Sequence, residues 1–119
     1  MKKTLILGAS TNPSRYAFKA AERLIAAGYD IVPYGIKKGE IFGIEILNDW
    51  TEVDEVHTVT MYVGAARQSE YYEKIVALNP KRVLFNPGTE NPEFYALLNK
   101  AGIETEEACT LVLLSLGEY

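Results

Sequence analysis

The stretch TLILGASTNPSR, residues 4–15, joins a short apolar run to a loop of small and polar residues. The run at residues 4–7 is typical of a strand covered on both faces, as strands of parallel sheets are. Gly8 ends this run. Asn12 followed by Pro13 predicts the start of a helix, because asparagine caps helices and proline fits the first helical position. The stretch therefore predicts a strand, a glycine turn and a helix in succession.

The same alternation of strand and helix continues along the chain. Apolar residues recur at helical spacing until Gly28, and a second Asn-Pro pair at residues 91 and 92 repeats the capping pattern. Strands are predicted at residues 4–7, 30–33, 44–47, 56–63 and 82–85, with an edge strand at 103–105, and helices at 13–27, 65–78 and 92–101. The apolar segment 111–116 is too short to assign to either class.

Short connections between alternating strands and helices predict right-handed βαβ crossovers and a parallel sheet. We therefore expect an α/β fold with a single doubly wound parallel sheet, forming one domain over residues 1–119. The expected strand order is 3-2-1-4-5, with the strands counted in chain order from residues 4–7 to 82–85. In such sheets ligands bind outside the carboxyl ends of the strands where the order reverses, here between the first and fourth strands.

Composition narrows the range of partners. The 119 residues carry 16 acidic and 12 basic side chains, for a net charge of −4, and the basic residues form no long cluster. Such a surface repels phosphodiester backbones, so no nucleic-acid partner is expected. A chain of this mass should fold with a surface of about 6,500 Å². No apolar run approaches the roughly 20 residues of a membrane helix, and no leader pattern is visible, so we expect no membrane partner and a cytoplasmic location.

The loop at residues 8–15 is the first candidate for a binding site. It joins a strand to a helix N-terminus, which offers backbone N–H groups and about half a positive charge to an anion. Ser10 adds a hydroxyl group, and Arg15 lies where a cation is unfavourable unless an anion binds beside it. This arrangement favours a phosphate site. The alternative is an ordinary capped loop with an exposed arginine.

Two features argue against a dinucleotide such as NAD in this loop. The glycine pattern G-x-G-x-x-G is absent, because only Gly8 is present between residues 8 and 13. An acidic residue should also follow the second strand to bind the ribose hydroxyls. Here Lys37 and Lys38 occupy that region, and the first acid is Glu40. The lysines favour a nucleotide with an extra ribose phosphate, or a polyphosphate, unless they belong to a solvated turn.

Over nearly its whole length the sequence resembles the small CoA-binding domain proteins, which are similar in fold to the CoA-binding domain of succinyl-CoA synthetase alpha subunits. The matching motifs are Gly8-Ala9-Ser10 followed by Arg15, Gly28-Tyr29 then Val32-Pro33, Gly43, Phe85-Asn86-Pro87-Gly88-Thr89-Glu90, and Ala101-Gly102-Ile103. Their order and spacing together make the resemblance specific. It implies a Rossmann-like domain with coenzyme A as its ligand.

The resemblance also implies which residues hold CoA. Residues of the first loop would bind the diphosphate, those after the second strand the 3′-phosphoadenosine, those after the fourth strand would border the adenine, and those after the fifth would close the pocket. The expected binding residues are Gly8, Ala9, Ser10, Arg15, Pro33, Tyr34, Gly35, Lys37, Lys38, Tyr62, Val63, Asn86, Pro87 and Gly88.

The sequence contains no readable catalytic or metal site. His57 and Cys109 are the sole histidine and cysteine, and neither has a recognisable partner for catalysis or metal binding. We therefore expect binding of CoA or an acyl-CoA through its nucleotide moiety, without evident catalysis. Two alternatives remain: an NAD(P)-binding oxidoreductase or redox-sensing domain, and an interaction module that binds no nucleotide. A homodimer joined through residues 111–116 is compatible with CoA binding.

Overall fold

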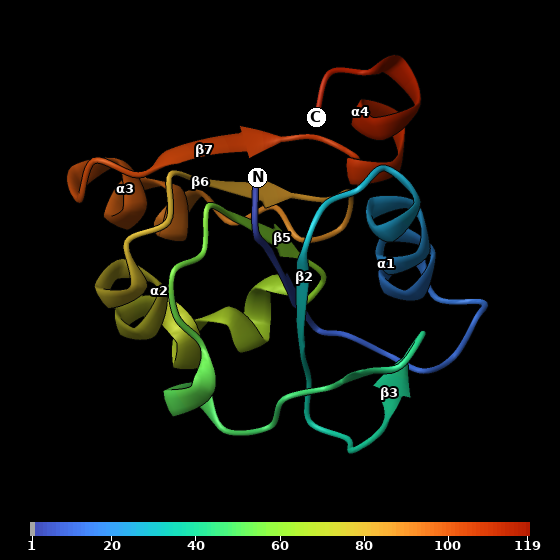
Figure 1. Ribbon diagram of the computed structural model, residues 1–119. Helices are drawn as coiled ribbons and strands as arrows, with labels where there is room; N and C mark the ends of the chain where they lie inside the picture. The colour runs from blue at the N-terminus through green and yellow to red at the C-terminus, as the bar shows by residue number, and fades with distance from the viewer. Residues whose placement is uncertain (1) are drawn as a thin grey trace.

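The computed structural model describes residues 2–119 and contains a five-stranded parallel sheet (Figure 1). Its strands are β1 (Thr4–Leu7), β2 (Ile31–Tyr34), β5 (Thr58–Met61), β6 (Arg82–Phe85) and β7 (Glu104–Glu107), in the order β2-β1-β5-β6-β7. A separate antiparallel hairpin is formed by β3 (Glu40–Ile41) and β4 (Ile44–Glu45). The helices are α1 (Tyr16–Ala26), α2 (Tyr72–Leu78), α3 (Pro92–Lys100) and α4 (Thr110–Leu116), with 3₁₀-helices η1 (Trp50–Glu52) and η2 (Ala65–Tyr71).

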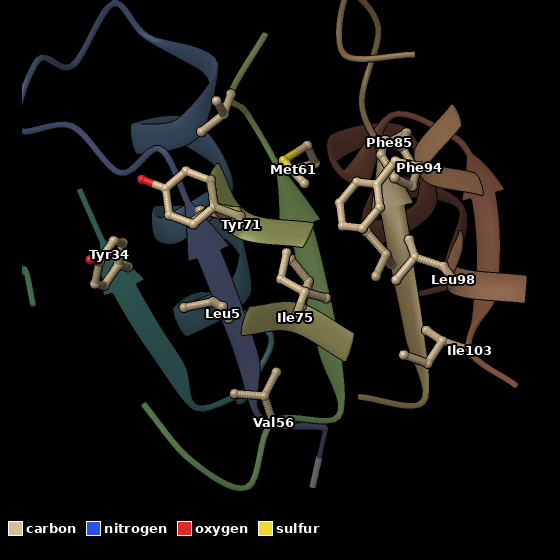
Figure 2. Packing of buried hydrophobic residues seen from close by; sticks show 14 of the residues in the cluster. Leu5, Tyr34, Val56, Met61, Tyr71, Ile75, Phe85, Phe94, Leu98 and Ile103 are labelled. Carbon is tan, nitrogen blue, oxygen red and sulfur yellow. The ribbon is translucent and has the colours of Figure 1, made fainter. Parts of the chain in front are cut away.

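Helices cover both faces of the sheet, with α1 and α4 on one side and α2 and α3 on the other (Figure 1). Successive strand residues point to opposite faces, so Leu5 and Leu7 pack towards α2 and α3 while Ile6 packs towards α1. Figure 2 shows the first of these layers, where Phe94 and Ile75 lie against the sheet. Burial on both faces explains why the strands are apolar without alternation. The accessible surface is 6461 Å², close to the expected value.

The predicted parallel doubly wound sheet is confirmed, with one qualification at an edge. The segment at residues 44–47 lies beside β2 as expected, but it joins the sheet through a single parallel bridge between Tyr34 and Leu47. The rest of this segment pairs with residues 40–41, because Phe42 and Gly43 take positive φ angles of 50° and 82° and turn the chain back. The fifth strand of the sheet is β7, the predicted edge strand.

The predicted start of the first helix at Asn12 and Pro13 is wrong. The helix α1 begins at Tyr16 and its N-cap is Arg15. The Asn12 side chain instead accepts hydrogen bonds from the backbone N–H of Ser14 (3.0 Å) and from its hydroxyl (2.8 Å). Asparagine closes such local turns as readily as it caps helices, and here the turn forms instead.

The second Asn-Pro pair behaves as predicted, since the Asn91 side chain accepts from Phe94 N and Pro92 begins α3. The helix expected over residues 65–78 is divided: its first half is the 3₁₀-helix η2 and only its second half is α-helical. The unassigned segment 111–116 lies within α4. Among residues 2–119, no helix is long and apolar enough to cross a membrane.

Candidate functional site

The loops that follow β1, β2 and β5 meet at the carboxyl edge of the sheet, at the point where the strand order reverses. Gly8 has a φ of +98°, and a Cβ there would lie 3.1 Å from the carbonyl carbon of Tyr62. A Cβ at Gly35 would lie 2.8 Å from the carbonyl oxygen of Ala9. The structure therefore brings three of the predicted segments into backbone contact, and glycine is what allows that approach.

Alanine at Gly35 should destabilise the fold by about 1–3 kcal/mol, because the added methyl group meets backbone that cannot move aside easily. Gly64 provides the matched control: a Cβ there has no neighbour within 4 Å and its φ is ordinary. Gly64→Ala should be neutral or stabilising by up to about 1 kcal/mol, since it reduces the freedom of the unfolded chain. Urea unfolding of both variants measures this, and equal stabilities would show that the close approach does not constrain the fold.

The backbone N–H groups of the first loop are not all available to a ligand. The N–H groups of Gly8 and Ala9 both donate to the carbonyl oxygen of Tyr34, at 3.0 and 2.9 Å. Pairing between β1 and β2 thus continues past the strand ends. Within residues 2–119, the N–H groups of Ser10 and Thr11 have no protein acceptor, and those of Tyr16 and Ala17 in the first turn of α1 also have none.

The N-terminus of α1 is open to a ligand. Arg15, its N-cap, has extended backbone angles, makes no side-chain capping bond and is exposed. Its first turn contains no acidic residue. Asn12 and Ser14 bond to each other, and Ser10 Oγ accepts from Asn12 N at 3.1 Å. The loop is therefore held by its own side chains, while the positive end of the helix dipole stays uncompensated.

The turn at residues 35–39 packs against this loop. A Cβ at Gly39 would lie 2.7 Å from the side-chain methyl carbon of Thr11. Lys37 and Lys38 are both exposed on this turn, but their surroundings differ. Lys38 lines a hollow of about 300 Å³ together with Glu45, Asp49 and Glu52, whereas Lys37 does not. Carboxylates beside Lys38 weaken its attraction for a phosphate, so Lys37 is the better candidate.

Pro33 and Tyr34 support the candidate site by their packing and by their backbone groups, not by exposed side chains. Both are buried, and the ring of Tyr34 packs edge-on against Trp50, with centroids 5.2 Å apart, and against Tyr71 (Figure 2). Burial, more than the nearby carboxylates of Asp49 and Glu70, raises the pKa of the Tyr34 phenol. The Tyr34 carbonyl is the group that holds the first loop.

Three of the predicted binding residues after β5 and β6, Tyr62, Val63 and Asn86, are buried or half-buried and pack or hydrogen-bond within the protein. Burial raises the pKa of Tyr62 to about 12, and its side chain packs with the layer of α1 and α4. Val63 is buried in the opposite layer. The Asn86 amide donates to Thr60 Oγ1 (2.8 Å) and Met61 O (2.9 Å), and its oxygen accepts from Thr110 N (2.9 Å). Both of its N–H donors are thereby used.

Pro87 and Gly88 are exposed beyond β6, so they remain available to a ligand. The loop that carries them is held by Gln68, whose amide donates to the carbonyl oxygens of Val63 and Thr89, both at 2.8 Å. Gln68 is fully buried and joins the loops after β5 and β6. This role of Gln68 could not be predicted from the sequence, because a glutamine on a helix carries no local sign of it.

Larger hollows lie elsewhere on the surface. One of about 590 Å³ lies between η1 and α2, and one of about 390 Å³ between α2 and α3. Neither is lined by residues of the first loop or of the turn at 35–39. The candidate site is distinguished by its open N–H donors, its positive charges and its position at the switch point of the sheet.

His57 lies at the opposite edge of the sheet, just before β5. Its Nδ1 is 2.7 Å from Thr58 Oγ1, and burial, followed by the charge of Arg82, lowers its pKa. Cys109, the N-cap of α4, is half-buried and follows β7. The structure thus places His57 away from the candidate loops.

Comparison with known proteins assigns the family. The family model for the CoA binding domain matches residues 2–115 of this chain. A crystal structure of an uncharacterized protein is 50% identical, with a TM-score of 0.97 and coverage of 100% of this chain and 98% of that one. A structure from Thermus thermophilus is 26% identical, with a TM-score of 0.89 and coverage of 99% and 90%.

A dinucleotide-forming acetyl-coenzyme A synthetase from Ca. Korarchaeum cryptofilum shares the fold, at a TM-score of 0.74 and 16% identity. The match covers 87% of this chain but 25% of that one. No curated protein matches the chain. The family match extends over almost every described residue, including all the loops at the carboxyl edge of the sheet. The chain belongs to the CoA-binding domain family.

Proposed function

We propose that residues 1–119 act as one domain that binds coenzyme A, or an acyl-CoA, through its nucleotide moiety. The observation that carries the proposal is the open N-terminus of α1, capped by an exposed arginine, in a chain of this family. An arginine at the positive end of a helix is unfavourable in the free protein. A bound diphosphate reverses this effect, because its charge attracts both the guanidinium group and the helix N-terminus.

The open donors suggest how the diphosphate is held. The N–H groups of Ser10 and Thr11 and those of Tyr16 and Ala17 supply neutral donors, while Arg15 supplies the charge. Gly8 contributes close approach rather than a donor, since its N–H is bonded to Tyr34. The phosphate contacts therefore lie slightly later in the loop than the resemblance alone implies.

The turn at residues 35–39 suggests what distinguishes CoA from NAD. It packs against the first loop and contains two lysines and no acidic residue. The adenosine ribose of CoA carries a 3′-phosphate, which Lys37 can attract. The ribose of NAD carries free hydroxyls, which need a carboxylate acceptor at this place. The charge of the turn therefore favours CoA.

The proposal predicts that the protein binds CoA and binds NAD more weakly. Isothermal titration with CoA, acetyl-CoA, NAD, NADP and ADP tests this, and a thermal shift should accompany each ligand that binds the native state. Tighter binding of NAD than of CoA would replace the proposal with the oxidoreductase or redox-sensing alternative. An absence of binding by all five compounds would leave the interaction module.

A further inference from the structure

Asn48 is joined to the turn that carries the two lysines. Its side-chain Nδ2 donates to the carbonyl oxygen of Gly35 at 2.7 Å and to that of Lys37 at 3.1 Å. Among residues 2–119, the Lys37 carbonyl accepts no other hydrogen bond. One amide group thus ties together two backbone positions of the turn.

Backbone hydrogen bonds hold only the ends of this turn. Gly35 N donates to Leu47 O (3.1 Å), and Ile46 N donates to Gly39 O (2.8 Å). The residues between them belong to neither strand nor helix. The Asn48 amide therefore fixes the middle of the turn, where Lys37 lies. Asn48 also lines the hollow that contains Lys38, Glu45, Asp49 and Glu52. It contacts the backbone carbonyl of Lys37, so it influences the Lys37 side chain through the backbone of the turn.

We propose that Asn48 is a positioning residue that holds the turn at residues 35–39 in the conformation presenting Lys37 to the ribose 3′-phosphate of CoA. This inference rests on the proposed function. Without the amide, the backbone at Lys37 gains freedom, and the lysine must lose that freedom when it meets the phosphate. The diphosphate is held by other residues, so the effect should be selective for ligands with the 3′-phosphate.

The test is a double-mutant cycle between Asn48→Ala and Lys37→Ala, with CoA and 3′-dephospho-CoA as the titrated ligands. The wild type should prefer CoA by up to about fivefold, the range expected for one partly exposed charge pair. Each single variant should reduce this preference towards onefold, while dephospho-CoA binding changes by less than about twofold. The double variant should lose no more preference than either single one, because the two residues act through one contact.

Lys100→Ala and Asn99→Ala are the matched controls. Lys100→Ala removes an equal charge from the last turn of α3, and Asn99 is an exposed asparagine on the same helix. Both variants should keep the preference for CoA. Equal weakening of both ligands by Asn48→Ala, or additive effects in the double variant, would overturn the inference and leave Asn48 as a structural residue.

A second variant keeps the test valid if the alanine variant unfolds. Asn48→Asp preserves the shape of the side chain but has no N–H group to donate when ionised, so its CoA preference should fall as in Asn48→Ala. A CoA preference of Asn48→Asp equal to that of the wild type would contradict the inference, whereas failure of the wild type to bind CoA at all would overturn the proposed function itself.

Discussion

Replacing Arg15 with aspartate is expected to abolish measurable CoA binding while making the protein more stable. Loss of the charge-assisted contact alone, as in Arg15→Ala, should weaken binding by about 1.5–3 kcal/mol, or about 10- to 150-fold. The aspartate adds repulsion of the diphosphate. In the free protein the same change supplies the missing cap, because Arg15 already has the extended backbone angles of an N-cap.

The expected gain in stability is about 0.5–2 kcal/mol from capping, with a further contribution from a negative charge at the helix N-terminus. Arg23→Asp is the mirror-image control, since Arg23 lies in the last turn of the same helix. It makes the same charge change but should lower stability by about 0.3–1 kcal/mol and leave CoA binding nearly unchanged.

Thermal unfolding and isothermal titration on Arg15→Asp and Arg23→Asp measure both effects. A loss of stability in Arg15→Asp, together with unchanged affinity for CoA, would show that Arg15 serves the fold. A similar loss of affinity in both variants would show that CoA responds only to net charge. Added salt should weaken CoA binding by the wild type more than by Arg15→Ala, since exposed charges are screened.

Replacing Asn86 with alanine is expected to cause the largest loss of stability, about 2–5 kcal/mol. Its side chain is 3% exposed and makes hydrogen bonds to β5 and to the first residue of α4. Alanine leaves Met61 O and Thr110 N without these partners in the interior, and each unsatisfied group is destabilising by about 1–3 kcal/mol. The short helix α4 also loses the bond to its first N–H group.

Urea unfolding of Asn86→Ala beside Asn99→Ala gives the comparison, since exposed Asn99 should change stability by less than about 0.5 kcal/mol. CoA affinity, measured where the variant is folded, separates structure from ligand contact. An unfolding free energy close to that of the wild type, with CoA binding lost, would make Asn86 a direct ligand residue, as the family resemblance implies.

Much of the fold could be predicted because its signals are local. The apolar run at residues 4–7 indicates a strand buried on both faces whatever its neighbours are, and β1 forms there. Asn91 caps α3 as predicted, since its acceptor and the N–H group it meets are three residues apart. The order of strands followed from short connections and right-handed crossovers.

The candidate site was predicted as a set of loops, but the conformation of the first loop was not. Asn12 has the same sequence signal as Asn91 and forms a turn instead of a cap, so the helix starts at Tyr16. A local signal shared by two structures cannot choose between them.

The sequence by itself determined the parallel α/β fold and the family, and it predicted the loop at residues 8–15 as a phosphate site. The tertiary structure alone decided which donors are open, since Tyr34 occupies the N–H groups of Gly8 and Ala9 from another strand. It also distinguished Lys37 from Lys38 and brought Asn48 to the turn. The physical reason is that a hydrogen bond depends on the approach of its two groups in space, and these pairs lie about ten or more residues apart in the chain.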